Sequence, residues 1–409
     1  MMINSNVNRP ERLYYLDWLR VFAFSILLFE HSAEVFVDWK YWIKNEETSV
    51  FLTQFIAFFL PWRMPLLFII SGAAVTLSFK RKSVMSYFSE RCVRLLVPLA
   101  FALILIIPPQ IYFIRLYRGS GEAWTEFFYS IINLDWHWSP KGNIHFMHLW
   151  YLAFLFIYCM LLLPVLQFAK SDTGKYIIEK MSGVFSNSYL LLTMGVFINL
   201  PYFVLKTTLP MTYYVSTFAY YFPFFVCGLV FWPNASFRYA IRRCTGKALL
   251  GGVALTAGLY WFSITKNDPH TYFLNLSSPG NLPLFILKSL NQWLWVLGIF
   301  GLAMRALNYG SERLTYATQA VYPFYILHQT VIIIASYFVI KMEAGVTYKL
   351  ALITFVSFGF IYALYELIIK RTNFTRILFG VKPEAKQRES QPMVENIFKA
   401  PVMGQKAAV

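Results

Sequence analysis

Two ionisable residues lie in one apolar stretch, RVFAFSILLFEHSAEVF, which begins at Arg20 and contains His31. The eleven steps between them, at about 100° each, return to nearly the same face of a helix, and a rise of about 1.5 Å per residue separates the side chains by roughly 16 Å. Ionisable groups are costly inside a bilayer and mark a site or a pathway. Neutral imidazole readily takes a proton from a hydroxyl group. The pattern therefore predicts that His31 acts as a general base or a transient carrier, with Arg20 on the same face.

Three carboxylates accompany this pair, because Asp17, Glu30 and Glu34 fall within the same broad arc. Adjacent helix residues point about 100° apart, so Glu30 shares the face of His31 poorly. We expect Asp17, Glu34 or a residue of another helix to orient the imidazole. The alternative is a buried histidine that hydrogen-bonds a backbone carbonyl. Arg20 and the two acids favour the functional interpretation.

The composition predicts a membrane protein. Hydrophobic residues make up 58% of the 409 residues and charged residues only 14%, and the mean hydropathy is +0.51. Soluble domains do not have this composition. Because a helical span needs about 20 apolar residues, we expect an all-α integral membrane protein, a single bundle of about ten transmembrane helices. The predicted spans are 16–38, 51–78, 93–114, 148–168, 188–205, 214–232, 248–265, 283–305, 321–340 and 349–369.

The distribution of basic residues predicts that both termini face the cytoplasm. Lys and Arg are concentrated in segments on the side of the N-terminus, including the run from Lys80 to Arg94, and cytoplasmic loops carry this excess. The first span begins too late and is too polar for a cleavable signal peptide. The asymmetry accounts for the net charge of +16 without nucleic acid. A basic inner face suits anionic lipid heads or a phosphorylated cofactor.

We expect one membrane domain at 16–370, a cytoplasmic segment before it at 1–15 and a cytoplasmic tail after it at 371–409. The tail is polar and reads as a solvated end. The four cysteines have no paired spacing and do not indicate a disulfide framework.

The segment RCVR places Arg91 and Arg94 three residues apart, on one helix face. Two guanidinium groups at this spacing can bind phosphates. The alternative is that both arginines anchor the helix end at lipid headgroups. The apolar LLVPL that follows at once favours a site.

Arg63 lies deep in the second predicted span, where a lone guanidinium requires an anion. A small carboxylate on a substrate would serve. An ion pair with Asp17 or Glu34 is an equal alternative.

His148, with Trp150 beside it, and His328 lie near or within later spans and are expected to line the same cavity. Interfacial anchoring is the alternative for His148. His145 and His148 also have helical metal-ligand spacing, with Asp135 and His137 nearby, but no fixed carboxylate partner is visible and we predict no metal site. Aromatic residues between 115 and 147 suggest a platform for sugar rings, but an interfacial belt explains them without a ligand and is slightly favoured. These residues are Trp124, Tyr129, Trp136 and Trp138.

Several fragments, in their order and spacing, resemble the acyltransferase 3 family of integral membrane acyltransferases. They are Arg20 with His31, RMPLLFIISG at 63–72, RCVR at 91–94, HLWYL at 148–152 and YILH at 325–328. The resemblance runs from about residue 12 to about 383. YYFPFFVCG at 220–228 and the ending YELIIKRTNFTRILFGVKP at 365–383 resemble a subgroup associated with succinylation of periplasmic glucans.

The resemblance implies the roles of several residues. His31 matches the group proposed to handle acyl transfer, with Arg20 as its partner, and Arg91 and Arg94 match a motif linked to the acyl-CoA donor. Ser71 and Gly72 match a small pair where helices approach closely or a thin ligand passes.

The resemblance also implies the setting of the reaction. Acyl-CoA is expected as co-substrate, with no permanently bound cofactor. A multi-pass protein of a bacterial inner membrane and a periplasmic glycan acceptor are implied, with other proteins of glucan synthesis as partners. The extra periplasmic domain of many relatives has no counterpart in this sequence.

Two alternatives remain at this stage. One keeps the family and changes the reaction to O-acetylation of another envelope glycan, since an acetyl group offers no second carboxylate for Arg63. The other is a transporter of a small anion or glycan, in which the buried charges act as a relay.

Overall fold

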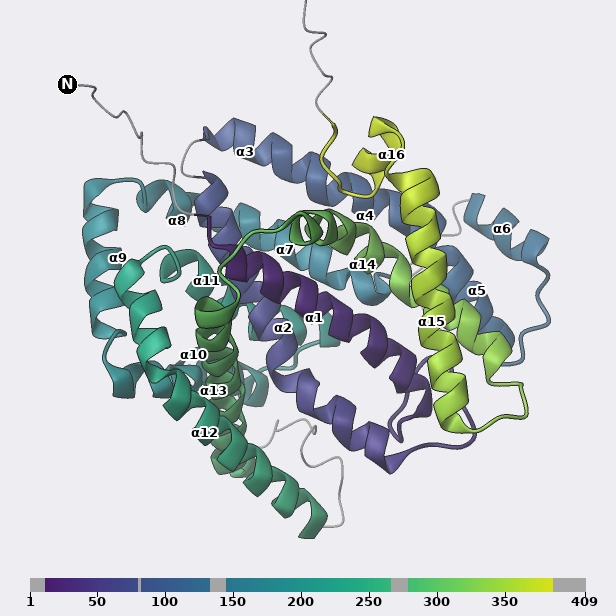
Figure 1. Ribbon diagram of the computed structural model, residues 1–409, viewed down its shortest axis with the longest axis horizontal. Helices are drawn as coiled ribbons and strands as arrows, with labels where there is room; N and C mark the ends of the chain where they lie inside the picture. The colour runs from purple at the N-terminus through teal and green to yellow at the C-terminus, as the bar shows by residue number, and fades with distance from the viewer. Residues whose placement is uncertain (1–11, 80–81, 133–144, 266–278, 385–409) are drawn as a thin grey trace, which may run out of the picture.

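The computed structural model describes residues 12–79, 82–132, 145–265 and 279–384. All regular elements in these residues are helices, which confirms the predicted all-α class (Figure 1).

The first half of the chain alternates long helices with short turns. Its elements are α1 (Tyr14–Ala33), the 3₁₀ turn η1 (Glu34–Phe36), α2 (Val50–Phe79), α3 (Val84–Arg91), the π-turn η2 (Cys92–Leu96), α4 (Val97–Phe101), the π-turn η3 (Ala102–Ile106), α5 (Ile107–Tyr117), α6 (Trp124–Ile132), the 3₁₀ turn η4 (Met147–Leu149), α7 (Trp150–Leu161), α8 (Leu163–Phe168) and α9 (Asp172–Val184).

The second half contains the longest helices. Its elements are α10 (Ser188–Thr208), α11 (Tyr213–Val230), α12 (Ala235–Thr265), the 3₁₀ turn η5 (Pro279–Asn281), α13 (Leu282–Ala306), α14 (Glu312–Val339), α15 (Val346–Leu364), the π-turn η6 (Tyr365–Ile369) and α16 (Asn373–Leu378).

Eight helices of the described chain have the length and apolar composition of a membrane span: α2, the continuous α3–α5, α10, α11, α12, α13, α14 and α15 with η6. Eight of the ten predicted spans fall on these helices. The first corresponds to α1, where Asp17, Arg20 and Glu30 interrupt the apolar composition. The fourth is divided at Leu162 into α7 and α8, because Pro164 has no backbone N–H to continue the helix. The chain is thus a multi-pass membrane protein, and a count of ten remains a prediction.

Helix α1 runs through the middle of the bundle (Figure 1). It contacts α2 and α13 on one side and α14 and α15 on the other. Helices α10–α13 pack with α2 into one group, and α5, α14 and α15 form a second group. The side chains of α1 therefore face the interface of the two groups, where polar residues are shielded from lipid.

Glycines let α2 and α11 approach each other closely. A Cβ atom at Gly72 of α2 would lie 2.1 Å from the carbonyl oxygen of Phe225 on α11, and one at Gly228 of α11 would lie 2.0 Å from the carbonyl oxygen of Ile69. Small residues let membrane helices approach backbone to backbone. The α2–α11 contact thus fixes one wall of the interior.

Two prolines leave backbone carbonyls without their usual helical partner, and each carbonyl is bound by a side chain from another helix. Pro65 has no N–H for the carbonyl of Pro61, which accepts a hydrogen bond from Nε2 of Gln292 on α13 instead. Pro98 has none for the carbonyl of Arg94, which accepts from the hydroxyl of Tyr322 on α14 at 3.0 Å. These bonds lock the proline-containing helices to their neighbours.

The described chain begins and ends at the same end of the bundle, which we call the arginine end. Tyr14 at the start of α1 lies against Gly310, just before α14, and the segment after α16 packs on Tyr322 and near Arg94. Helix α1 runs from there to the opposite, histidine end, which contains His31.

Candidate active site

A cavity of about 700 Å³ opens inside the bundle at the histidine end. Its walls come from α1, α2, η4, α7, α11 and α14, and its polar lining includes His31, Glu34, Arg63, His148 and Gln329. Aromatic rings complete the wall, among them Trp150, which stacks on Tyr221 at 5.6 Å between ring centroids. The cavity therefore combines a shielded interior with a few convergent polar groups, as ligand sites do.

His31 lines this cavity and is held by Glu34. Nδ1 of His31 lies 2.7 Å from Oε2 of Glu34, and the His31 side chain is 16% exposed. The two residues are three apart, so the last turn of α1 and the 3₁₀ turn η1 bring them together. A carboxylate only accepts hydrogen bonds, so Nδ1 carries a proton, and in the neutral imidazole Nε2 then keeps its lone pair. The described residues give Nε2 no hydrogen-bond partner, and the ring is therefore set up to accept a proton from a ligand.

The loop after η1 covers His31. The ring of Tyr41 stacks on the imidazole at 6.3 Å and 15°, and burial together with the charges of Glu34 and Glu30 raises the pKa of Tyr41 well above its usual range. Tyr41 therefore stays protonated beside the imidazole. In the same loop, Lys44 donates a hydrogen bond to the carbonyl of Val37, and burial lowers the pKa of Lys44.

His148 enters the cavity from a strained turn. Met147 has a φ of 45°, a conformation rare for a residue with a side chain. The turn is held by Nδ1 of His145, which accepts from the N–H of Met147 at 2.7 Å. Nε2 of His148 then donates to the carbonyl of Ile326 at 3.0 Å, and the hydroxyl of Tyr325 donates to the carbonyl of His148 at 2.5 Å.

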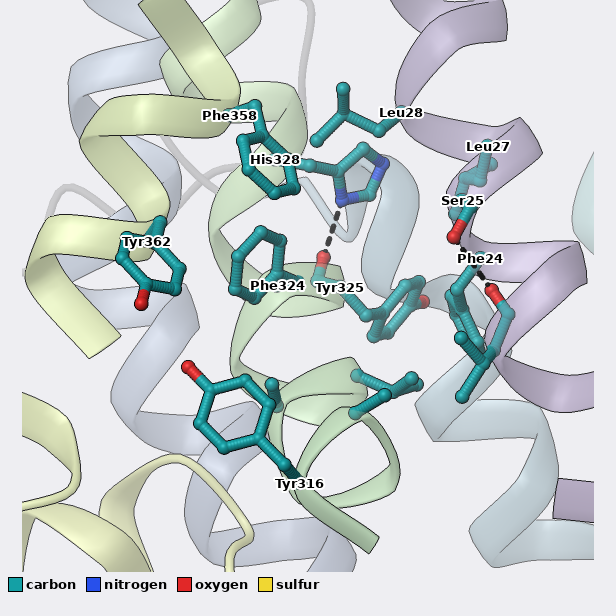
Figure 2. Close-up of a pocket in the computed structure, with 14 residues that line it drawn as sticks. Phe24, Ser25, Leu27, Leu28, Tyr316, Phe324, Tyr325, His328, Phe358 and Tyr362 are labelled. Carbon is teal, nitrogen blue, oxygen red and sulfur yellow. Dashed lines mark hydrogen bonds between the residues drawn. The ribbon is translucent and has the colours of Figure 1, made fainter. Parts of the chain in front are cut away.

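His328 on α14 was expected to line the same cavity as His148, but it lines the neighbouring apolar groove and lies behind the wall of the histidine cavity. Figure 2 shows it pointing toward α1, with Nδ1 donating to the carbonyl of Tyr325 at 2.6 Å. Its ring centroid lies 5.2 Å from that of His31 and 4.8 Å from that of His148. The structure thus brings together three histidines that are far apart in sequence. Figure 2 also shows an apolar groove between α1, α14 and α15 on the other side of His328.

Arg63 binds Glu30, and neither Asp17 nor Glu34. Nη1 of Arg63 lies 2.8 Å from Oε2 of Glu30, and Nη2 donates to Oε1 at 3.0 Å. Both side chains are buried yet line the cavity. The paired charges are shielded from lipid in the wall beside His31.

Arg20, Arg91 and Arg94 lie toward the arginine end, where Asp17 is also located. Asp17 accepts from Arg12 at 2.8 Å and lies 3.4 Å from Arg20. Arg91 donates to Ser78 and lies over the ring of Tyr87. The guanidinium of Arg94 has no acidic partner within salt-bridge distance among the described residues. This end carries excess positive charge.

Ser71 and Gly72 lie between the two ends and differ in environment. Oγ of Ser71 is 2.6 Å from the hydroxyl of Tyr151, a residue that lines the cavity. Gly72 lies in the α2–α11 contact.

Residues 13–366 match the acyltransferase domain of the acyltransferase 3 family. The chain belongs to this family. It is also similar to the glucans biosynthesis protein C of Escherichia coli O157:H7 and to that of Escherichia coli strain K12, with 24% identity over 397 residues in each case. The matches cover 93% of this chain and 97% of each relative. No solved structure matches the chain.

The protein is therefore a membrane acyltransferase, and the resemblance found in the sequence is confirmed. The histidine cavity is the place in the bundle where a base, a shielded volume and polar wall groups coincide. Asp135, Trp136, His137 and Trp138 lie outside the described residues. Trp124 and Tyr129 lie on α6 and are largely exposed.

Several residues of this candidate site were not singled out from the sequence. Tyr41, Tyr151, Tyr325 and Gln329 line the cavity. In a chain with 27 tyrosines, residue type alone carries no signal. The available signal was nearness in the sequence to the candidate histidines. Tyr151 lies in HLWYL with His148, and Tyr325 and Gln329 lie in YILHQ with His328.

Proposed function

We propose that the protein moves a succinyl group from acyl-CoA to hydroxyl groups of a periplasmic glucan, in a bacterial inner membrane and with both termini in the cytoplasm. The glucan acceptor is suggested by the similarity to glucans biosynthesis protein C, and other proteins of glucan synthesis are the expected partners. The observation that carries the proposal is the Glu34–His31 pair, which leaves Nε2 of His31 available in a cavity of about 700 Å³.

His31 performs the proton transfer in this proposal. Nε2 takes the proton of an acceptor hydroxyl while the hydroxyl oxygen attacks the thioester carbon. The carbon–sulfur bond breaks, the acyl group stays on the acceptor oxygen, and the imidazolium returns the proton to the thiolate that leaves. The Glu34 carboxylate holds the ring and stabilises its charged form.

The positive arginine end suits the phosphates of the donor. Arg91 and Arg94 are placed there, and Arg20 lies about 16 Å along α1 from His31. A thioester bound by its phosphates at the arginine end would need an extended arm to reach His31, and pantetheine is such an arm. Ser71 and Tyr151 lie between the two regions and would contact it.

One observation favours O-acetylation as a second candidate. The guanidinium of Arg63 is already paired with Glu30, so the wall adds no net positive charge for the free carboxylate of a succinyl group. The remaining N–H groups of Arg63 could bind the succinyl carboxylate only at a position next to the negatively charged Glu30. The mass of the transferred group separates the candidates.

The test is mass spectrometry of envelope glycans from a strain that lacks its own transferase and expresses this chain, its His31→Ala variant or its Ser25→Ala variant. Ser25 lies on the groove face of α1 and hydrogen-bonds the carbonyl of Val21, so it is a matched control. We expect a succinyl increment with the parent chain and Ser25→Ala, and none with His31→Ala. An acetyl increment would show that the transferred group is acetyl and not succinyl. An increment that is still present with His31→Ala would overturn the role of His31.

A further inference from the structure

A second cavity, of about 410 Å³, lies at the arginine end between α3 and the segment that follows α16. One side presents Ser86 and Ser89 of α3 with Val93 and Arg94 of η2, and the other side presents Ile377 at the end of α16 and Lys382 after it. It is separate from the histidine cavity.

The segment after α16 is fixed in place over this cavity. Arg376, which is buried, donates from Nε to the carbonyl of Lys382 at 3.0 Å and from Nη1 to the carbonyl of Lys370 at 3.2 Å. Asn373 exchanges two hydrogen bonds with the backbone of Glu384. The cavity is therefore preformed by a network within the C-terminal segment.

A glycine brings this segment onto the bundle. Gly380 has a φ of 68° and lies so close to Tyr322 that a Cβ atom would be 2.1 Å from the ring. The same tyrosine binds the carbonyl of Arg94. Tyr322 thus ties the C-terminal segment to the π-turn η2, and so to Arg94.

The chemistry of the cavity matches a flat ring that carries phosphates. Val93, Ile377 and Pro383 give aliphatic walls, and Arg94, Lys382 and the two serine hydroxyls supply donors for anionic oxygens. Glu90 also lines the cavity, but Lys82 pairs with its carboxylate. Neither Arg94 nor Lys382 has an acidic partner within salt-bridge distance among the described residues. An occupant with several negative charges would balance this surface.

The cavity lies at the arginine end, and Arg94 is part of its wall. The histidine cavity lies toward the other end of α1, and its wall includes Tyr151, whose hydroxyl is 2.6 Å from Oγ of Ser71. A ligand with its nucleotide beside Arg94 would therefore need an extended arm to reach the base.

We propose that the cavity between α3 and residues 377–383 binds the adenine nucleotide end of the donor, with Lys382, Ser86 and Ser89 contacting its phosphates and Val93 and Ile377 enclosing the base. This inference rests on the proposed acyl-CoA donor. It assigns to the C-terminal segment a role in donor affinity that is separate from the transfer step.

The test compares binding of coenzyme A and of pantetheine, which lacks the adenine nucleotide and all the phosphates, to the full chain in nanodiscs. We expect Lys382→Ala and the Ser86→Ala/Ser89→Ala double variant to weaken coenzyme A binding about tenfold, because each removes hydrogen bonds to charged phosphates. Binding of pantetheine is expected to stay unchanged. Lys180→Ala, on the exposed face of α9, is the matched control.

A second variant tests the pocket without removing charge. Val93 is 49% exposed, so Val93→Trp fills the cavity from a tolerant position, and we expect it to weaken binding of coenzyme A alone. If the parent chain binds no coenzyme A, the donor in the proposed function is wrong. If it binds and all three variants bind equally well, the donor stands and the nucleotide pocket is wrong.

Discussion

Glu30 and Arg63 form a buried ion pair with two contacts between α1 and α2. Glu30 directly precedes His31 in the sequence. His31 itself binds Glu34. The separation follows from helix geometry, because neighbouring residues point about 100° apart and residues three apart share a face. Two acids of similar sequence position therefore have different partners: Glu30 neutralises a cation in the wall and Glu34 orients the base.

Replacing Arg63 alone should destabilise the protein strongly. Arg63→Met leaves the buried carboxylate of Glu30 unpaired, which costs about 3–5 kcal/mol. We expect a large drop of the thermal midpoint in detergent. The double variant Arg63→Met/Glu30→Gln should recover most of it, because no charge is then left unpaired.

The double variant also separates the two roles of Arg63. If the pair is structural, the recovered protein transfers succinyl groups at the parental rate. If Arg63 also binds the donor carboxylate, the double variant loses succinyl transfer while remaining folded. A double variant as unstable as Arg63→Met would contradict the ion-pair account.

Glu34→Gln should lower kcat while leaving KM and stability nearly unchanged. The amide can donate to Nδ1 and so favours the tautomer with the proton on Nε2, which is not a base. We expect a decrease of more than about tenfold, but smaller than the roughly 100- to 10,000-fold effect of removing a general base. Steady-state kinetics would show it, and Glu34→Asp should retain part of the activity. Equal kcat in parent and Glu34→Gln would exclude an orienting role.

The sequence predicted the helical class and most spans, because apolar runs of membrane length are a local property. It also indicated Arg20 and His31, because ionisable residues in such a run are conspicuous. It did not predict the break between α7 and α8 at Leu162, since Pro164 alone does not distinguish a kink from an end.

The partner of Arg63 could not be read from the sequence. It depends on how α1 and α2 rotate against each other, which the α2–α11 contact at Gly72 and the packing of α14 decide. The same applies to the meeting of His148 with His328, which requires the strained turn at Met147. Side chains on different helices meet only through tertiary packing.

Gly72→Ala should separate α2 from α11 and destabilise the fold. A Cβ atom there meets backbone atoms of Phe225 and Leu229, which cannot move aside as a side chain does. Overpacking of this kind costs about 1–3 kcal/mol, and activity should fall with it because α2 carries Arg63 and Ser71. Gly246→Ala is the control, since nothing lies within 4 Å of its Cβ position and alanine favours a helix by about 0.5–1 kcal/mol. Identical thermal midpoints for Gly72→Ala and the parent chain would show that the helices are not in such close contact.

His145 should make the fold less stable as the pH falls below about 6.5, the usual value for histidine. Burial lowers the pKa of His145 in the folded protein, so the unfolded chain binds its proton at a higher pH than the folded chain does. Stability therefore declines with falling pH through this range and levels off below the folded pKa. His145→Gln keeps an acceptor for the N–H of Met147 but does not titrate, so its thermal midpoint should fall less than the parental one between about pH 7.5 and pH 5.5. Parallel curves for the two proteins would show that His145 contributes nothing to this dependence.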